Sequence, residues 1–485
     1  MTRGNVLKTV KQPNFLDASI PLIFLVLMLA FSVFMYGGDS SFGPNQIILL
    51  ISAGIAALIG IKNGYTWKSI EEAMVHGISV SMGAIFILLA VGSLIGTWLA
   101  AGTVPTLIYY GLQVLNPDWF YAAACLISAI VAMSIGSSWT TAATVGVALM
   151  GIANGIGMSP AIAAGAVVSG AYFGDKISPL SETTNLAPAV AGSDLFTHIR
   201  HMLWTTVPAF VIALILFMLL GFSDSGNSSD VNIGNVQAIL ANTYDISIIH
   251  LLPLVVLLTM AIKKVPAFPA IFIGALIGAV WALVFQQDLL VRLAGEDAQF
   301  GELSVVWKAM YDGFAIETGN DTMDSLLSRG GMSSMLNTTW LIMTALMFGA
   351  VMEKLGLLAV FVQGILKAAK SSGSLITSTI FTAFGVNLAT ADQYMSIVMP
   401  GRMYREEYER RGLESVNLSR ALEDGGTITS PLIPWNTCGA YMAGALLISP
   451  FDYWYYAFFN LINPILAIAF ALLGIKVLKK QVATA

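Results

Sequence analysis

Residues 170–185 read GAYFGDKISPLSETTN, and this stretch indicates both the fold class and the position of a candidate site. It carries three charged residues inside an otherwise apolar segment: Asp175, Lys176 and Glu182. Charged side chains within a membrane segment are costly, and they usually have a function. Gly174 also weakens a helix, and Pro179 removes a helix hydrogen bond and frees a backbone carbonyl, which lipid cannot satisfy. The stretch therefore predicts a helix that is broken inside a membrane and faces a polar site.

The composition of the 485-residue chain supports a membrane location. Apolar residues make up 56% of the chain and charged residues 11%, whereas a soluble protein carries roughly 25% charged residues. The apolar residues form blocks of about 17–25 residues, each long enough to cross a lipid bilayer as a helix. The net charge of −5 gives no sign of nucleic-acid binding, and Cys125 and Cys438 indicate neither a disulfide framework nor a metal site. We predict an all-α polytopic membrane protein that is not an enzyme.

Ten apolar segments are predicted to span the membrane: 19–36, 45–61, 78–101, 160–192, 202–222, 246–262, 267–285, 338–353, 417–449 and 454–475. Two further apolar stretches, 119–157 and 374–400, each have a polar tip and are predicted to be re-entrant hairpins. Basic residues of membrane proteins are enriched on the cytoplasmic side. A cytoplasmic N-terminus places most of the 23 basic residues inside; the exceptions are Arg292, Lys308 and Arg329, outside, and Lys176, within a span. We therefore expect the inner (cytoplasmic) membrane, with both termini in the cytoplasm.

The two halves of the chain share short motifs in the same order. Ile20-Pro21-Leu22 recurs as Leu252-Pro253-Leu254, and Ser178-Pro179-Leu180 recurs as Ser430-Pro431-Leu432. Each half contains five predicted spans, an odd number, so the second copy must be inverted in the membrane. Two inverted repeats with broken helices at the midplane are typical of secondary transporters. We predict a first repeat at residues 1–222, an external linker at 223–245 and a second repeat at 246–485; chance similarity between membrane helices is the alternative.

Each predicted repeat combines a broken helix, within 160–192 or 417–449, with one hairpin tip. Together they offer hydroxyl, amide, carboxylate and carbonyl oxygens, which suit an alkali cation rather than a soft metal. The candidate ion- or substrate-binding residues are Ser137, Ser138, Thr140, Thr141, Asp175, Ser178, Glu182, Asn185, Asn387, Thr390, Asp392, Thr429, Ser430, Asn436 and Thr437. The expected Na+ ligands among them are Asp175, Ser138, Thr140 and Asp392, with Lys176 as the charge partner.

Structural roles are the alternative for the charged residues of both broken helices. Asp175 and Lys176 could neutralise each other, but adjacent residues on a helix point about 100° apart. They would pair directly only if the backbone is unwound there. Glu423 and Asp424 could be interfacial acids near Arg420.

Three motifs resemble those of the NhaC-type Na+/H+ antiporters, in the ion-transporter superfamily that also holds the sodium-dicarboxylate carriers. They are residues 174–185, Ser328-Arg329-Gly330-Gly331-Met332 and Pro434-Trp435-Asn436-Thr437. The resemblance covers nearly the whole chain, and it implies a homodimer in which a transport domain moves against a scaffold domain. The hairpin tips are similar to the Ser-Asn-Thr tips of the dicarboxylate carriers, although the first tip, Ser137-Ser138-Trp139-Thr140, lacks the asparagine.

The activity we expect is exchange of Na+ for H+ at a shared carboxylate. Asp175 would bind Na+ when ionised and release it when protonated, while one bundle of helices rocks against the other. Na+ and H+ are the transported or coupling ions, and no cofactor is expected. The alternative is a Na+/H+-coupled exchanger of a small organic anion or amino acid, of the malate/lactate type, in which Lys176 or the helix N-termini face the solute carboxylate. A passive channel is disfavoured, because a pore needs no inverted pair of broken helices.

Overall fold

The structure is a computed structural model that describes residues 10–224, 233–294 and 300–480. Within these ranges the regular secondary structure is helical, apart from one isolated bridge between Leu413 and Lys479. The all-α prediction is confirmed. The middle of the predicted linker, residues 225–232, lies outside the described residues, as do 1–9 and 481–485.

Seven helices in the described ranges are long and apolar enough to cross a membrane. They are α1 (Phe15–Tyr36), α2 (Pro44–Lys62), α3 (Trp67–Ala100), the helix Pro117–Ile135, α10 (Leu195–Asp224), α13 (Ala267–Phe285) and the helix Met332–Lys354, which contains α17 (Leu336–Lys354). Two bent pairs bring the number to as many as nine: Gly234–Thr243 with Ile248–Ile262, bent by 87°, and Pro450–Tyr456 with Phe458–Leu472, bent by 56°. The chain is therefore a multi-pass membrane protein.

Several predicted spans each lie within one of these helices, namely 19–36, 45–61, 202–222, 267–285 and 338–353. The span predicted at 78–101 begins earlier, at Trp67, because the hydroxyl of Thr66 caps α3 by accepting a hydrogen bond from the Ser69 amide. The span predicted at 246–262 follows a bend between Thr243 and Ile248, and the span predicted at 454–475 is bent between Tyr456 and Phe458. Their helical parts are α12 (Leu252–Ile262) and α24 (Phe458–Leu472).

Both segments predicted to be hairpins consist of two helical arms that meet at a sharp turn. The first has α5 (Phe120–Ile135) as one arm, and α6 (Ser138–Thr141), a π-helix (Ala142–Gly146) and α7 (Val147–Gly155) as the other. Gly136 turns the chain at φ +75°, and a Cβ atom there would lie 2.6 Å from Cβ of Leu180. The second has α19 (Ser372–Thr390) and α20 (Gln393–Arg410), so its second arm is ten residues longer than predicted.

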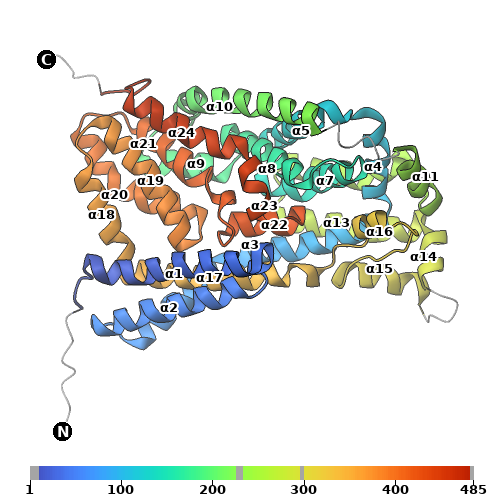
Figure 1. Ribbon diagram of the computed structural model, residues 1–485, viewed down its shortest axis with the longest axis horizontal. Helices are drawn as coiled ribbons and strands as arrows, with labels where there is room; N and C mark the ends of the chain where they lie inside the picture. Colours follow the sequence, from blue (N-terminus) through green and yellow to red (C-terminus); the bar gives the residue numbers. More distant parts are fainter. Residues whose placement is uncertain (1–9, 225–232, 295–299, 481–485) are drawn as a thin grey trace, which may run out of the picture.

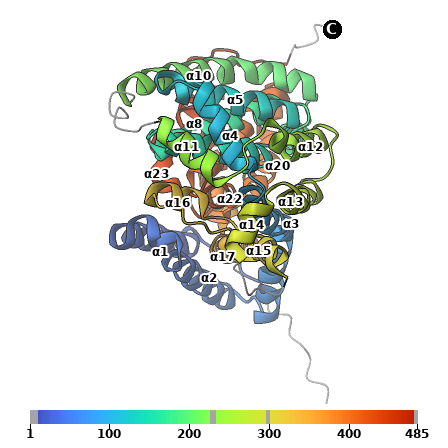
Figure 2. The ribbon, with the colours of Figure 1, turned by 90° about the vertical axis from the view of Figure 1, so that its right-hand side faces the viewer.

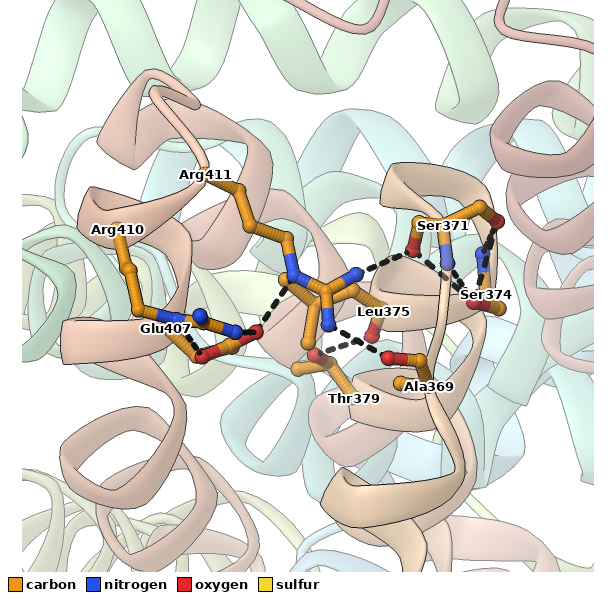
Figure 3. Close-up of polar contacts among 8 residues, drawn as sticks. All are labelled: Ala369, Ser371, Ser374, Leu375, Thr379, Glu407, Arg410 and Arg411. Carbon is orange, nitrogen blue, oxygen red and sulfur yellow. Dashed lines mark hydrogen bonds and ion pairs between the residues drawn. The ribbon is translucent and has the colours of Figure 1, made fainter.

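A cluster of charged and backbone groups joins the base of the second hairpin (Figure 3). Arg411 donates from Nη1 to the carbonyl of Ser371 at 2.8 Å and from Nε to the carboxylate of Glu407 at 2.6 Å. Arg410 also donates to Glu407, at 2.7 Å. Hydrogen bonds from Arg410 and Arg411 lower the pKa of Glu407 to about 2, from a usual value of 4.5. The two arms are thereby tied together at the end opposite their turn.

Short helices occupy several connections that were predicted without regular structure: α11 (Ile233–Thr243), α14 (Gln287–Ala294), α15 (Gly301–Tyr311) and α16 (Asp321–Leu327), together with α4 (Thr103–Val114) and α18 (Leu357–Ala368). α4 and α18 each begin after a glycine in the left-handed conformation, Gly102 at φ +72° and Gly356 at φ +70°. At 12 residues each, they are too short to cross a bilayer as a straight helix.

The helices form a layered bundle in which α1 and α2 lie at one edge and α5 and α10 at the opposite edge (Figures 1 and 2). α3 packs against α13 and α17 between these edges. The Ser328–Met332 stretch contacts α3, where the Gly331 amide donates to the Gly92 carbonyl at 2.7 Å. A Cβ atom on Gly92 would lie 2.3 Å from the Gly331 carbonyl oxygen, so close backbone packing explains the glycines of this motif.

Candidate functional site

The first broken helix is interrupted immediately after its charged pair. α8 (Pro160–Ile177) ends, residues 178–181 are unwound, and α9 (Glu182–Ala191) begins. Pro179 cannot donate a backbone hydrogen bond, and the Ser178 hydroxyl donates instead to the Met133 carbonyl on α5, at 2.8 Å. The Thr184 hydroxyl donates to the Lys176 carbonyl at 2.9 Å. Local side chains therefore satisfy part of the backbone that the break exposes.

Asp175, the last acid before this break, is held by the tip of the first hairpin. Its Oδ2 atom accepts hydrogen bonds from the Ser138 amide at 3.1 Å and the Ser138 hydroxyl at 2.7 Å. The residue is only 7% exposed. Two hydrogen bonds from one serine fix the direction of the carboxylate and stabilise its ionised form.

Lys176 points away from Asp175, because the helix is continuous through Ile177. It forms an ion pair with Asp424, and both side chains are completely buried. Asp424 also accepts a hydrogen bond from the Asn463 amide at 2.8 Å. The sequence left two alternatives: neutralisation of Asp175 by Lys176, and an interfacial position for Asp424. The structure shows neither, because Lys176 pairs with Asp424 and both side chains are completely buried.

The second broken helix is more irregular than the first. It runs through α21 (Ser415–Leu422), a π-helix (Glu423–Thr427), a 3-10 turn (Ser430–Leu432) and α22 (Thr437–Leu446). Cβ atoms on Gly425 and Gly426 would lie 2.6 Å from the Ile380 carbonyl oxygen and 2.7 Å from the Ser396 hydroxyl oxygen. The paired glycines therefore let this segment pack closely against both arms of the second hairpin.

The tip of the second hairpin faces this second break. Asn387 donates from Nδ2 to the Gly426 carbonyl at 2.6 Å and to the Thr429 hydroxyl at 3.1 Å. Asn436 in turn donates to Oδ1 of Asn387 at 3.0 Å. Asp392 caps the N-terminus of α20, where its carboxylate accepts a hydrogen bond from the Met395 amide at 2.7 Å. Each tip thus contacts the break that lies in its own half of the chain.

A single cavity of about 730 Å³ brings residues of both tips and of the first break together. The candidate residues that line it are Ser137, Ser138, Thr140, Asp175, Glu182, Asn185, Asp392 and Thr437. The loop between α12 and α13 lines it too, and α3 contributes another wall. Of the described lining residues, three are carboxylic acids and Lys264 is the only base. The walls therefore favour a cation.

Several candidate residues do not line the cavity and instead bond to nearby backbone or amide groups. Hydroxyl groups donate to carbonyl oxygens from Thr141 to Ser137 at 2.9 Å, from Thr390 to Val386 at 2.8 Å and from Ser430 to Thr427 at 2.7 Å. Ser178, Asn387, Thr429 and Asn436 have the bonds already described. These residues shape the breaks and tips.

Two residues of the site were not predicted from the sequence. Asn463 donates a hydrogen bond to Asp424 of the buried ion pair, and Gln393 lines the cavity. No local sequence pattern marks either residue.

Broken helices, facing hairpin tips and a cavity walled by carboxylates define a polytopic membrane protein with the features of a solute carrier. Residues 170–475 match the model of the Na+/H+ antiporter family. The Na+/H+ antiporter NhaC of Alkalihalophilus pseudofirmus is 40% identical over 90% of this chain and 92% of its own length. The chain belongs to this family, whose named relatives are transporters rather than enzymes.

Other relatives carry names for different exchanges. The malate-2H+/Na+-lactate antiporter of Bacillus subtilis is 40% identical over 96% of both chains. The arginine/ornithine antiporter ArcD of Halobacterium salinarum is 37% identical over 97% of this chain and 94% of its own length. Antiport is the activity these names share, whereas the solute differs between them.

Proposed function

We propose that the protein exchanges Na+ for H+ across the cytoplasmic membrane by alternating access, with Asp175 as the group that both ions compete for. The observation that carries this proposal is the position of Asp175, at the broken end of α8, in the cavity wall and hydrogen-bonded twice to Ser138. A carboxylate in that position can bind one monovalent cation at a time. Na+ and a proton would then exclude each other.

The neighbouring groups match the chemistry of an alkali cation. Hydroxyl oxygens of Ser137, Ser138 and Thr140 line the same wall as Asp175, and Asp392 and Thr437 come from the second half. Hard oxygen ligands of this kind suit a hard cation such as Na+. Ser138 would serve twice, because its hydroxyl can donate to Asp175 or turn a lone pair towards Na+.

The order of structural elements supports two inverted repeats, 1–222 and 246–485, joined by the linker 223–245. A long helix, a short helix after a left-handed glycine, a two-armed hairpin and a broken helix follow one another twice, beginning at α3 and at α17.

The cavity is lined by Lys264, in a loop that the distribution of basic residues assigns to the cytoplasm. The cavity would then face the cytoplasm. The homodimer implied by the family resemblance belongs to the same proposal.

Exchange of an organic solute is the second candidate, and the size of the cavity favours it. About 730 Å³ exceeds what Na+ needs and falls in the range of small-molecule sites. Lys176, the residue expected to receive a solute carboxylate, is buried in its pair with Asp424 and does not line the cavity. The lining acids therefore favour a solute with an amino group over a dicarboxylate.

The test is transport by purified protein in liposomes. An outward Na+ gradient should drive proton uptake with wild-type protein and with D452N, a control at an exposed acid, and much less with D175N. Sodium-driven proton movement that is undiminished in D175N would contradict the proposal. Adding malate, lactate, arginine or ornithine then separates the two candidates, because a solute exchanger stays silent until its solute is present.

A further inference from the structure

Glu423 is a buried acid that the exchange at Asp175 does not use. It begins the π-helix of the second broken helix, and its side chain is 0% exposed. Neither carboxyl oxygen has a hydrogen-bond partner within the described part of the chain. The Thr427 hydroxyl lies beside it, is likewise buried and also has no partner there. Three oxygen atoms with unused lone pairs therefore share one buried position.

The charged groups near Glu423 do not neutralise it. They are Lys176, Asp175 and Asp424. The charge of Lys176 is already balanced by Asp424 in the buried ion pair. An ionised Glu423 would leave one uncompensated negative charge in the interior, at a penalty of several kcal/mol. A monovalent cation must therefore accompany this carboxylate at every stage, and that cation is a proton or a metal ion of charge +1.

A permanently protonated glutamate is the simpler case, because its O–H group could donate to the Thr427 hydroxyl oxygen beside it. One feature argues against it. The residue lies in a π-helix, a rare geometry that is frequent at functional sites. A carboxylate beside a free hydroxyl oxygen is instead the kind of ligand set that an alkali cation takes.

We propose that Glu423 and Thr427 form a second exchange site, at which Na+ replaces the proton that neutralises Glu423. This inference rests on the proposed function of Asp175 and extends it. The reaction is balanced: the carboxylic acid of Glu423 gives one proton to water, and one Na+ takes its place. Because Asp175 undergoes the same exchange, a full cycle moves equal numbers of Na+ and H+, and the interior stays neutral in both loaded states.

Sodium binding to the purified full-length protein tests this second site. Bound radioactive Na+ is counted by equilibrium dialysis in detergent, and released protons are counted in weakly buffered solution, at a pH low enough for both acids to carry their protons before Na+ is added. Wild-type protein is expected to bind two Na+ and release two protons, whereas E423Q should bind one and release one. The control E406Q alters an exposed acid and should match the wild type.

Two further variants keep the test decisive. T427A preserves the charge and should weaken one of the two Na+ sites by about tenfold, through loss of one oxygen ligand; it stands in for E423Q should that variant fail to fold. D175N should retain one Na+ at Glu423. One Na+ in both wild type and E423Q would overturn the second site, whereas two Na+ in D175N would overturn the role of Asp175 and leave Glu423 in place.

Discussion

Lys176 and Asp424 form a completely buried ion pair between the two broken helices, although they lie 248 residues apart in the chain. Asn463 and Thr205 complete the surroundings of the aspartate by donating hydrogen bonds to it. The pair therefore links the first half of the chain to the second, at the residue that follows Asp175. A buried pair of this kind contributes little net stability but is costly to break on one side.

Removing one partner of this pair should destabilise the protein strongly. K176M or D424N leaves a single charge without compensation, at about 3–5 kcal/mol. The double variant K176M/D424L removes both charges and should recover most of that loss. Thermal unfolding in detergent measures all three. Single variants as stable as the wild type would show that the pair is not formed.

The close contact of α8 with α5 should make Gly174 intolerant of any side chain. A Cβ atom there would lie 2.2 Å from the Ala129 carbonyl oxygen and 2.6 Å from the Met133 amide nitrogen. We expect G174A to lose about 1–3 kcal/mol through overpacking. G385A in α19 is the matched control, since a Cβ atom there has nothing within 4 Å. Equal melting temperatures for the two variants would refute the packing.

Ser138 should control the affinity of the site for Na+. S138A removes the hydroxyl that donates to Asp175 at 2.7 Å. A hydrogen bond to a charged group is worth about 1.5–3 kcal/mol, so Na+ should bind roughly 10- to 100-fold more weakly. In the control T144A, the lost hydroxyl donates to the Thr140 carbonyl of its own helix, and affinity should change little. Calorimetric titration with NaCl separates the two cases.

The base of the second hairpin should weaken only in strong acid. The pKa of Glu407 is lowered to about 2 by Arg410 and Arg411, so the folded state holds the ionised form more firmly than the unfolded chain does. Its contribution is fully present above the usual value of 4.5 and is lost as the pH falls towards about 2. E407Q should flatten the pH dependence of stability in that window. Chemical unfolding curves that keep the same acid dependence in E407Q would contradict this assignment.

The sequence allows the spans and the first broken helix to be predicted for clear physical reasons. Long apolar segments have few alternatives to a membrane helix, and a charged pair followed by Ser178-Pro179 cannot continue as one. Polar tips between apolar arms likewise indicated the turns near Gly136 and Asp392.

The remaining features depend on contacts between distant segments. The pairing of Lys176 with Asp424 is set by the packing of two halves of the chain, which no local pattern encodes. The same packing leaves the Glu423 carboxyl oxygens without a hydrogen-bond partner among the described residues. α4 and α18 are short and amphipathic, so they lack the length of a predicted span. The shared cavity joins both tips, whereas the sequence suggested a separate site in each half.

Sodium titration of the purified protein at a series of pH values tests the competition at Asp175 most directly. Each Na+ that binds there must displace one proton, so the apparent Kd for Na+ should rise by about tenfold for each unit of decrease in pH while Asp175 is mostly protonated. In D175N this site should be lost, and with it its share of the Na+-linked proton release. A Kd for Na+ that does not change with pH, or binding in D175N that equals the wild type, would contradict the account.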